Sequence, residues 1–304
     1  MSGEHHASGE GRHLLFRHPT ARAYLLLSPM LFLLGAGVLA PLGMLFVYSL
    51  WRKVGFEISH QPTTFNYLWF FTHPVYYTLI GKAILYGLIV ALATLVLAYP
   101  LANHVTMRVV RYKNAFLIAA LIPLYTSDLT RIFAWRSVLG LNGFINQMLI
   151  GLGLIDQPLE FLLFSPFSAV LTLIHQYFPF MFLALWAGLE TIRRSEIEAA
   201  KDLGARWFRS LRLVVFPLSL PGVAAGFLFV FVPVTGDYLA INLMGGPSGV
   251  TITNVIVEQF GQADNWPLGA ALAVMVLLAG MIVLVVLGAL LARLRSIRMY
   301  FGRT

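Results

Sequence analysis

The 304-residue sequence contains no cysteine, so a disulfide framework, a thiolate nucleophile and a cysteine-based metal site are all excluded. Charged residues are also scarce: they make up 11% of the chain, whereas an average soluble protein has about 25%. The sequence also lacks the G-x-x-x-x-G-K-[ST] pattern that cradles ATP phosphates and the H-E-x-x-H pattern of zinc enzymes. These absences predict a chain with no catalytic residues, no metal site and no cofactor of its own.

Hydrophobic residues make up 59% of the sequence and gather in six long runs, more apolar material than a soluble core requires. A helix needs about 20 apolar residues to cross the hydrocarbon of a bilayer, and it satisfies its own backbone hydrogen bonds there. We therefore expect an all-α membrane protein with about six transmembrane helices. The expected spans are 23–50, 77–103, 114–138, 166–188, 222–244 and 268–292.

The expected helices differ in how well they suit lipid. The third span carries Asp128, Arg131 and Arg136, so its second half is expected to face protein or water. The first span is too long for a cleaved signal peptide and is expected to remain as an anchor. Proline should bend or interrupt the helices that contain it, at positions 41, 100, 123 and 233.

The net charge of +8 is spread over short connections, which argues for membrane orientation rather than nucleic-acid binding. Basic residues occupy both tails and the second–third and fourth–fifth connections, whereas 139–167 and 245–267 contain no Lys or Arg. Because basic connections stay in the cytoplasm, both termini are expected inside. The expected division is a cytoplasmic tail (1–22), a transmembrane domain (23–295) with a cytoplasmic loop at 190–217, and a second cytoplasmic tail (296–304).

The loop between the fourth and fifth spans has its own local pattern. Ser195-Glu196-Ile197-Glu198 has the spacing of a capping box, in which Ser195 caps a helix and Glu198 bonds back. Gly204 suits the left-handed residue that ends such a helix. A second short helix is expected to follow, and Pro217 marks the approach to the fifth span. The pattern predicts a helix–turn–helix that projects into the cytoplasm.

The same loop resembles the EAA loop of the inner-membrane permeases of ATP-binding-cassette (ABC) importers. That family has Glu-Ala-Ala, a Gly six residues after the Glu, an apolar residue, and Pro near the nineteenth step. In the family, the loop docks in a groove of the ATPase subunit and transmits its closure to the membrane helices. The resemblance implies this coupling role for Glu198, Ala199, Ala200, Asp202, Gly204 and Pro217. The alternative, without a coupling role, is a basic surface loop in which Glu198 is only a helix cap.

A second stretch is similar to the first permease subunit of spermidine/putrescine-type systems. The matching positions are Leu129, Arg131, Ala134, Trp135, Asn142, Gly143 and Asn146. Carboxylates beside aromatic rings suit an organic cation, through ion pairing and cation–π attraction. The candidate residues of the solute path are Asp128, Trp135, Asp237 and Tyr238. The alternatives are that Asp128 simply pairs with Arg131 or Arg136 and that the aromatic residues anchor the chain at the membrane surface.

The resemblance implies a type I ABC importer permease fold in a bacterial inner membrane. It also implies three kinds of partner: a dimer of ATPase subunits that binds ATP and Mg²⁺, a second and similar permease, and an external solute-binding protein. The expected solute is a polyamine, and the alternative is an amino acid, an opine or a related organic ion. Two other classes remain open, an ion-coupled secondary transporter and a membrane-embedded enzyme. The first would need an inverted repeat and the second a catalytic set within the spans, and neither is evident.

Overall fold

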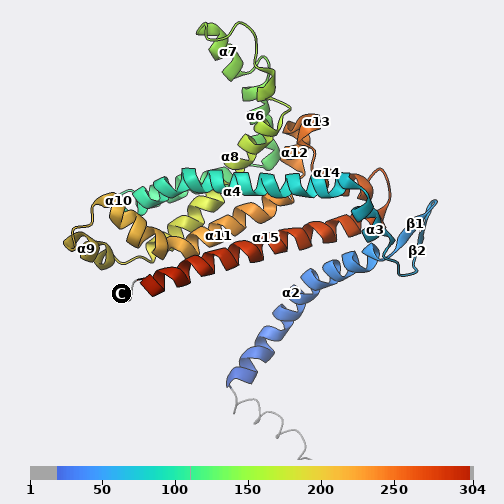
Figure 1. Ribbon diagram of the computed structural model, residues 1–304, viewed down its shortest axis with the longest axis horizontal. Helices are drawn as coiled ribbons and strands as arrows, with labels where there is room; N and C mark the ends of the chain where they lie inside the picture. Colours follow the sequence, from blue (N-terminus) through green and yellow to red (C-terminus); the bar gives the residue numbers. More distant parts are fainter. Residues whose placement is uncertain (1–18, 110, 302–304) are drawn as a thin grey trace, which may run out of the picture.

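The computed structural model describes the backbone of residues 19–109 and 111–301, and the side chains of 24–109 and 111–289. The expected all-α class is confirmed, although a short antiparallel hairpin, β1–β2, was not expected (Figure 1). The elements are α2 (Pro19–Ser49), β1 (Arg52–Val54), β2 (Glu57–Ser59), α3 (Phe65–Thr72), α4 (Pro74–Arg108), α5 (Lys113–Leu121), η1 (Ile122–Tyr125), α6 (Asp128–Leu139), α7 (Phe144–Gly151), η2 (Glu160–Leu162), α8 (Pro166–Glu190), α9 (Arg194–Asp202), α10 (Trp207–Ser210), η3 (Leu211–Val215), α11 (Phe216–Thr235), α12 (Leu239–Met244), α13 (Gly246–Gly249), α14 (Ile252–Phe260) and α15 (Trp266–Phe301).

Within the described ranges, five helical segments are long and apolar enough to cross a membrane, and a bent pair would make a sixth. The five segments are Tyr24–Ser49, Pro74–Arg108, Glu160–Glu190, Trp207–Thr235 and Trp266–Ala289. Five of the six expected spans therefore coincide with a spanning segment. The fifth was placed too late, at 222–244, because α11 already ends at Thr235 and α12 is a separate short helix.

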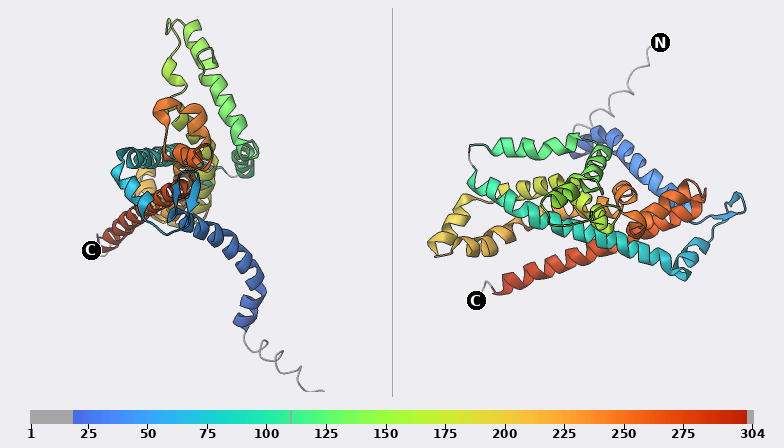
Figure 2. Two further views of the ribbon diagram at one scale, coloured as in Figure 1. Left: turned by 90° about the vertical axis from the view of Figure 1, so that its right-hand side faces the viewer. Right: turned by 90° about the horizontal axis from the view of Figure 1, so that it is seen from above.

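The third expected span, 114–138, is interrupted, as the sequence predicted for Pro123. Lys113–Tyr125 and Asp128–Gly151 meet at 92°. Pro123 lies in η1 at this break, where its missing N–H and fixed φ favour an interruption. Figure 2 shows α6 and α7 projecting away from the bundle. In contrast, the prolines at 41, 100 and 233 lie inside α2, α4 and α11 and interrupt none of them.

The main core lies where α4, α8 and α11 pack against one another. Its largest fully buried side chains include Phe182 and Phe231. α8 and α11 approach so closely that a Cβ on Gly188 would lie 2.7 Å from Cα of Gly222. A side chain at either position would push the two backbones apart.

α2 leaves this bundle and packs mainly beside the first part of α15 (Figure 1). The 18-residue window that qualifies α2 as a span is strongly apolar, and none of it is buried within the chain. Lipid or another protein must therefore cover most of its length.

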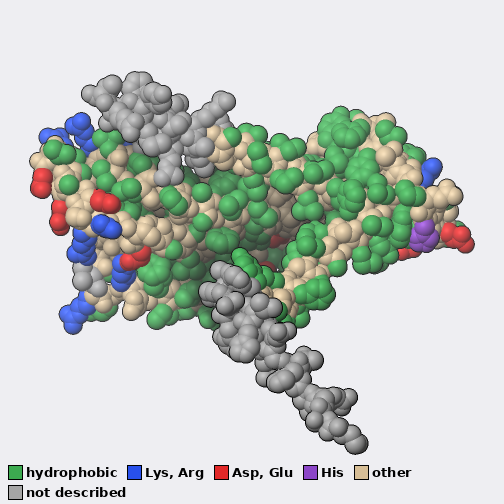
Figure 3. Space-filling view, turned by 90° about the horizontal axis from the view of Figure 1, so that it is seen from below, with side chains coloured by type: hydrophobic (Ala, Val, Ile, Leu, Met, Phe, Trp, Pro, Cys, Tyr) green, Lys and Arg blue, Asp and Glu red, His purple; other side chains and the backbone are tan. Residues whose placement is uncertain are grey.

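The two ends of the bundle differ. α9 and α10 lie at one end, and the β1–β2 hairpin lies at the other (Figure 1). In Figure 3, Lys, Arg, Asp and Glu gather mainly at the α9 end, and an apolar body separates them from a smaller charged group at the hairpin end. This distribution is that of a protein whose middle faces hydrocarbon.

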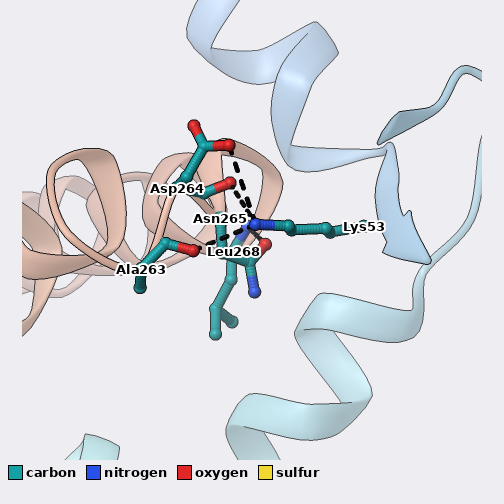
Figure 4. Close-up of polar contacts among 5 residues, drawn as sticks. All are labelled: Lys53, Ala263, Asp264, Asn265 and Leu268. Carbon is teal, nitrogen blue, oxygen red and sulfur yellow. Dashed lines mark hydrogen bonds and ion pairs between the residues drawn. The ribbon is translucent and has the colours of Figure 1, made fainter. Parts of the chain in front are cut away.

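Lys53 fastens the hairpin to the turn between α14 and α15 (Figure 4). Its Nζ donates to the carbonyl oxygens of Ala263, at 3.0 Å, and Asp264, at 2.8 Å. The carboxylate of Asp264 is more distant, at 3.7 Å, and largely exposed, so the carbonyl bonds dominate this contact. The strand that follows α2 is thereby tied to the start of α15.

Candidate functional site

The helix–turn–helix expected between the fourth and fifth spans is present as α9, α10 and η3. α9 ends in two backbone bonds, from Gly204 N to Lys201 O (2.8 Å) and from Ala205 N to Ala200 O (3.0 Å). Gly204 has φ of +79°, the left-handed conformation that this Schellman ending requires. The prediction for Gly204 is therefore confirmed.

The predicted capping box is wrong. α9 begins at Arg194 with Arg193 as its N-cap, and no side-chain hydrogen bond caps this helix in the described part of the chain. Ser195 is already the second helical residue, so its hydroxyl sits inside the first turn. Glu198 then lies two residues beyond N3, the position from which a side chain bonds back to the N-cap. The alternative interpretation, in which Glu198 only caps the helix, is therefore wrong as well.

The predicted coupling residues lie together at this end of the molecule. Glu198, Ala199, Asp202 and Gly204 are exposed, whereas Ala200 and Pro217 are half-buried. Pro217 is the second residue of α11, directly after the π-helical turn η3. The positions matched by the EAA pattern thus form one accessible projection between α8 and α11.

Large apolar side chains accompany these residues. Leu203, Trp207 and Phe208 are 89%, 58% and 67% exposed. They flank the α9 turn, next to the exposed charges. Exposed apolar groups rimmed by polar ones are typical of a protein-binding surface.

A second site is a cavity of about 960 Å³ between η1, α6, α8 and α11. Its lining residues are Leu124, Thr126, Ser127, Asp128, Arg131, Gln176, Tyr177, Phe180, Leu228, Phe229, Val232 and Pro233. The break after η1 forms one wall, because the chain turns there instead of continuing as a helix.

Polar groups face this cavity from α6 and α8. Arg131 is buried and pairs with Asp128, and its Nη1 donates to the carbonyl oxygen of Gln176 at 3.2 Å. The pairing of Asp128 with Arg131, one of the alternatives drawn from the sequence, is present. Two buried atoms of the lining residues have no hydrogen-bond partner among the described residues: Nε of Arg131 and Oε1 of Gln176.

Asp237 contacts Tyr177, which lines the cavity. The Tyr177 hydroxyl donates to Oδ2 of Asp237 at 3.3 Å, and the Ala240 backbone N–H donates to its Oδ1 at 2.9 Å. Asp237 belongs to the segment where α11 stops and α12 begins, so its carboxylate receives a backbone N–H that the start of α12 leaves free.

The four predicted path residues are only partly brought together. Asp128 lines the cavity, and Asp237 reaches it through Tyr177. Trp135 instead packs edge-on against His175, with ring centroids 5.7 Å apart, and Tyr238 is the residue before α12. Neither lines the cavity.

Sequence reasoning missed Gln176, Tyr177 and Phe180. The signal for the first two is an amide and a phenol side by side in the apolar run of α8.

Known proteins share both the sequence pattern and the fold. The family model described as "Binding-protein-dependent transport system inner membrane component" matches residues 115–296. The spermidine/putrescine transport system permease protein PotB of Escherichia coli (strain K12) is 33% identical over 213 residues, which cover 70% of this chain and 77% of that protein.

Solved structures match over a larger part of the chain. A bacterial ABC transporter involved in the import of the acidic polysaccharide alginate superposes with a TM-score of 0.69 at 16% identity, covering 93% of this chain and 99% of that chain. A bacterial alginate ABC transporter in complex with an alginate pentasaccharide-bound periplasmic protein gives a TM-score of 0.62 at 19% identity, over 89% of this chain and 93% of that chain. These matches confirm the expected permease fold.

Proposed function

The chain belongs to the family of inner membrane components of binding-protein-dependent transport systems, and we propose that it carries a polyamine such as spermidine or putrescine across the membrane. As a permease subunit of an ABC importer, it provides a path rather than a catalytic centre. The identity to PotB over most of the chain supports the polyamine as solute.

The observation that carries this proposal is the combination of polar and aromatic side chains in the wall of the 960 Å³ cavity. A protonated amine brings only donors, so it needs carboxylate, amide or hydroxyl oxygens. Oε1 of Gln176 is a buried acceptor with no partner among the described residues, and Asp237 adds a carboxylate through Tyr177. Phe180 and Phe229 line the cavity and offer ring faces to a cation.

Arg131 favours a second candidate solute. Its Nε faces no acceptor among the described residues, and a carboxylate would satisfy it. A zwitterion, such as an amino acid or an opine, would present a carboxylate to Arg131 and an amine to Gln176. The pairing of Arg131 with Asp128 argues for the polyamine, because it already neutralises the guanidinium.

The partners follow from surfaces that this chain leaves uncovered. The α9 projection, with Leu203 and Phe208 exposed, fits the groove of an ATPase dimer that would bind ATP and Mg²⁺. The apolar α2 fits a second permease, beside which it would cross the membrane. The alginate transporter bound to its periplasmic protein supports an external solute-binding protein as the third partner.

The test is solute uptake by the complete complex, reconstituted with its ATPase, its second permease and its binding protein. We expect ATP-dependent uptake of radiolabelled putrescine or spermidine, and weaker uptake of an amino-acid panel. Uptake of amino acids without uptake of either amine would leave the importer in place and remove the polyamine. If no solute enters although the ATPase co-purifies, the path itself is in doubt.

Orientation is tested separately by single cysteines, which the cysteine-free chain allows. Ser195 is exposed on α9, and Ser248 is exposed at α13. If the basic connections are cytoplasmic, Ser195→Cys should react only with a reagent that enters the cell, and Ser248→Cys should react from outside. Labelling of Ser195→Cys in intact cells by an impermeant reagent would reverse the proposed topology.

A further inference from the structure

A smaller cavity, of about 260 Å³, lies under α9 where α4, α9, α10 and η3 meet. It shares no lining residue with the cavity proposed for the solute. Its polar lining consists of Asn103, Arg108, Arg194, Glu198, Lys201 and Ser210.

The charge of this lining is strongly positive. Arg108 comes from the end of α4, and Arg194 and Lys201 come from α9, whereas Glu198 is the one acidic group among the lining residues. Three cationic side chains against one carboxylate leave an excess of two positive charges. Such a set disfavours a cation and favours a compact anion with several acceptor oxygens.

Two groups in the wall lack partners. Ser210 and Asn103 are 4% and 8% exposed, and Oγ of Ser210 and Oδ1 of Asn103 have no hydrogen-bond partner among the described residues. A buried polar atom without a partner costs about 1–3 kcal/mol, so such atoms usually serve a ligand or water. The Ser210 hydroxyl is free to donate to an anion, whereas Oδ1 of Asn103 is an acceptor and does not favour one.

The backbone beside the cavity is also irregular. η3 is a π-helical turn, Leu211–Val215, and both of its end residues line the cavity. A π turn accommodates an extra residue and often marks a functional site in a helix. Here it widens the helix directly after Ser210.

The position of the cavity selects a lipid as the source of the anion. It lies at the ends of two spanning segments, Pro74–Arg108 and Trp207–Thr235. Trp207 stands at its edge, 58% exposed, and Arg108 lies over its ring at 5.8 Å. Tryptophan beside basic residues is typical of the membrane surface, and basic pockets between spanning helices bind anionic headgroups. Phe216, exposed five residues after Leu211, offers apolar surface to an acyl chain.

We propose that this pocket binds the phosphate group of an anionic phospholipid. Arg108, Arg194 and Lys201 would surround the phosphate, and Ser210 would donate a hydrogen bond to it. Because the pocket joins α9 to the end of α4, the lipid would hold the projection that we assign to ATPase coupling. The binding site itself depends on neither the solute nor the ATPase.

The test measures binding of a short-chain fluorescent phosphatidylglycerol to the purified complex in detergent, by anisotropy. We expect saturable binding that phosphatidylcholine does not compete for. Arg108→Gln and Arg194→Gln should each weaken it about tenfold, because each removes a charge-assisted hydrogen bond. Arg209→Gln is the matched control, since Arg209 is exposed on α10 and does not line the pocket.

Ser210→Ala separates ligand binding from folding. If the hydroxyl has no partner in the empty pocket, its removal should leave the melting temperature of the delipidated complex unchanged or slightly raised. The same variant should weaken phosphatidylglycerol binding by about tenfold. A fall in melting temperature with unchanged lipid affinity would overturn the proposal.

Three further outcomes would also overturn it. Equal weakening by Arg209→Gln would mean that the basic surface attracts lipid without a site. Glycerol phosphate binding as tightly as the lipid would make the ligand a soluble anion. Loss of ATPase attachment with unchanged lipid binding in Arg108→Gln would assign the pocket to the subunit interface.

Discussion

Gly204→Val should abolish most solute uptake by the complex while leaving membrane insertion intact. Gly204 has φ of +79°, and a β-branched residue in that region costs about 1–2 kcal/mol. No atom lies within 4 Å of the position of an added Cβ, so the effect would come from the backbone alone. To relieve the strain, α9 would have to end in a different backbone conformation. The fraction of molecules whose α9 has the shape that docks on the ATPase would then fall roughly tenfold.

The measurement is ATP-driven uptake together with stimulation of ATP hydrolysis by the loaded binding protein. Gly204→Asn is the matched control, because asparagine tolerates the left-handed conformation and adds a side chain of similar size. We expect this variant to retain most of both activities. If the valine variant transports normally, α9 does not couple ATP hydrolysis to transport.

Asp237→Asn should reduce amine uptake by roughly thirtyfold without a comparable loss of assembled complex. The change removes the charge but keeps Oδ1, which accepts the Ala240 N–H. Loss of one partner of a desolvated charge pair costs about 2 kcal/mol or more, which corresponds to that factor. Tyr177→Phe, which removes only the hydroxyl that donates to Asp237, should have a smaller effect.

Uptake of radiolabelled amine should be compared at matched protein levels, with Asp264→Asn as the control. Asp264 undergoes the same chemical change, but its side chain is 72% exposed at the hairpin end and does not line the cavity. A silent Asp237→Asn in a complex that transports putrescine would remove Asp237 from the path and leave the solute unchanged. An equal loss in both variants would indicate a general effect on the complex.

The sequence predicts the spanning helices well because each needs only a long apolar run. It predicts Gly204 because the end of α9 is a local structure, set by the helix and the two residues after it. The capping box failed for an equally local reason: a start at Arg194 places Ser195 inside the helix. A spacing pattern cannot distinguish these two starts, since Ser195 and Glu198 are three residues apart in both.

The solute cavity was harder to predict from the sequence, because it is formed by helices that are distant in the chain and pack together in the fold. Asp128 was found as a charge in an apolar run, but its neighbours across the cavity come from α8 and α11. The 92° break that creates the wall at η1 also has no clear signature beyond Pro123, because the prolines at 41, 100 and 233 leave their helices continuous. Which proline interrupts a helix is decided by what packs around it.

The close approach of Gly188 and Gly222 has a mechanical consequence. α8 and α11 touch backbone to backbone near the α9 projection, and both line the solute cavity farther along, α8 from Gln176 onward. The two sites lie about 18 Å apart along α8, at 1.5 Å per residue. At Gly188 and Gly222 no side chain separates the two backbones, so the two helices should tilt together at this contact. A displacement of α9 would then change the width of the solute cavity without bending either helix.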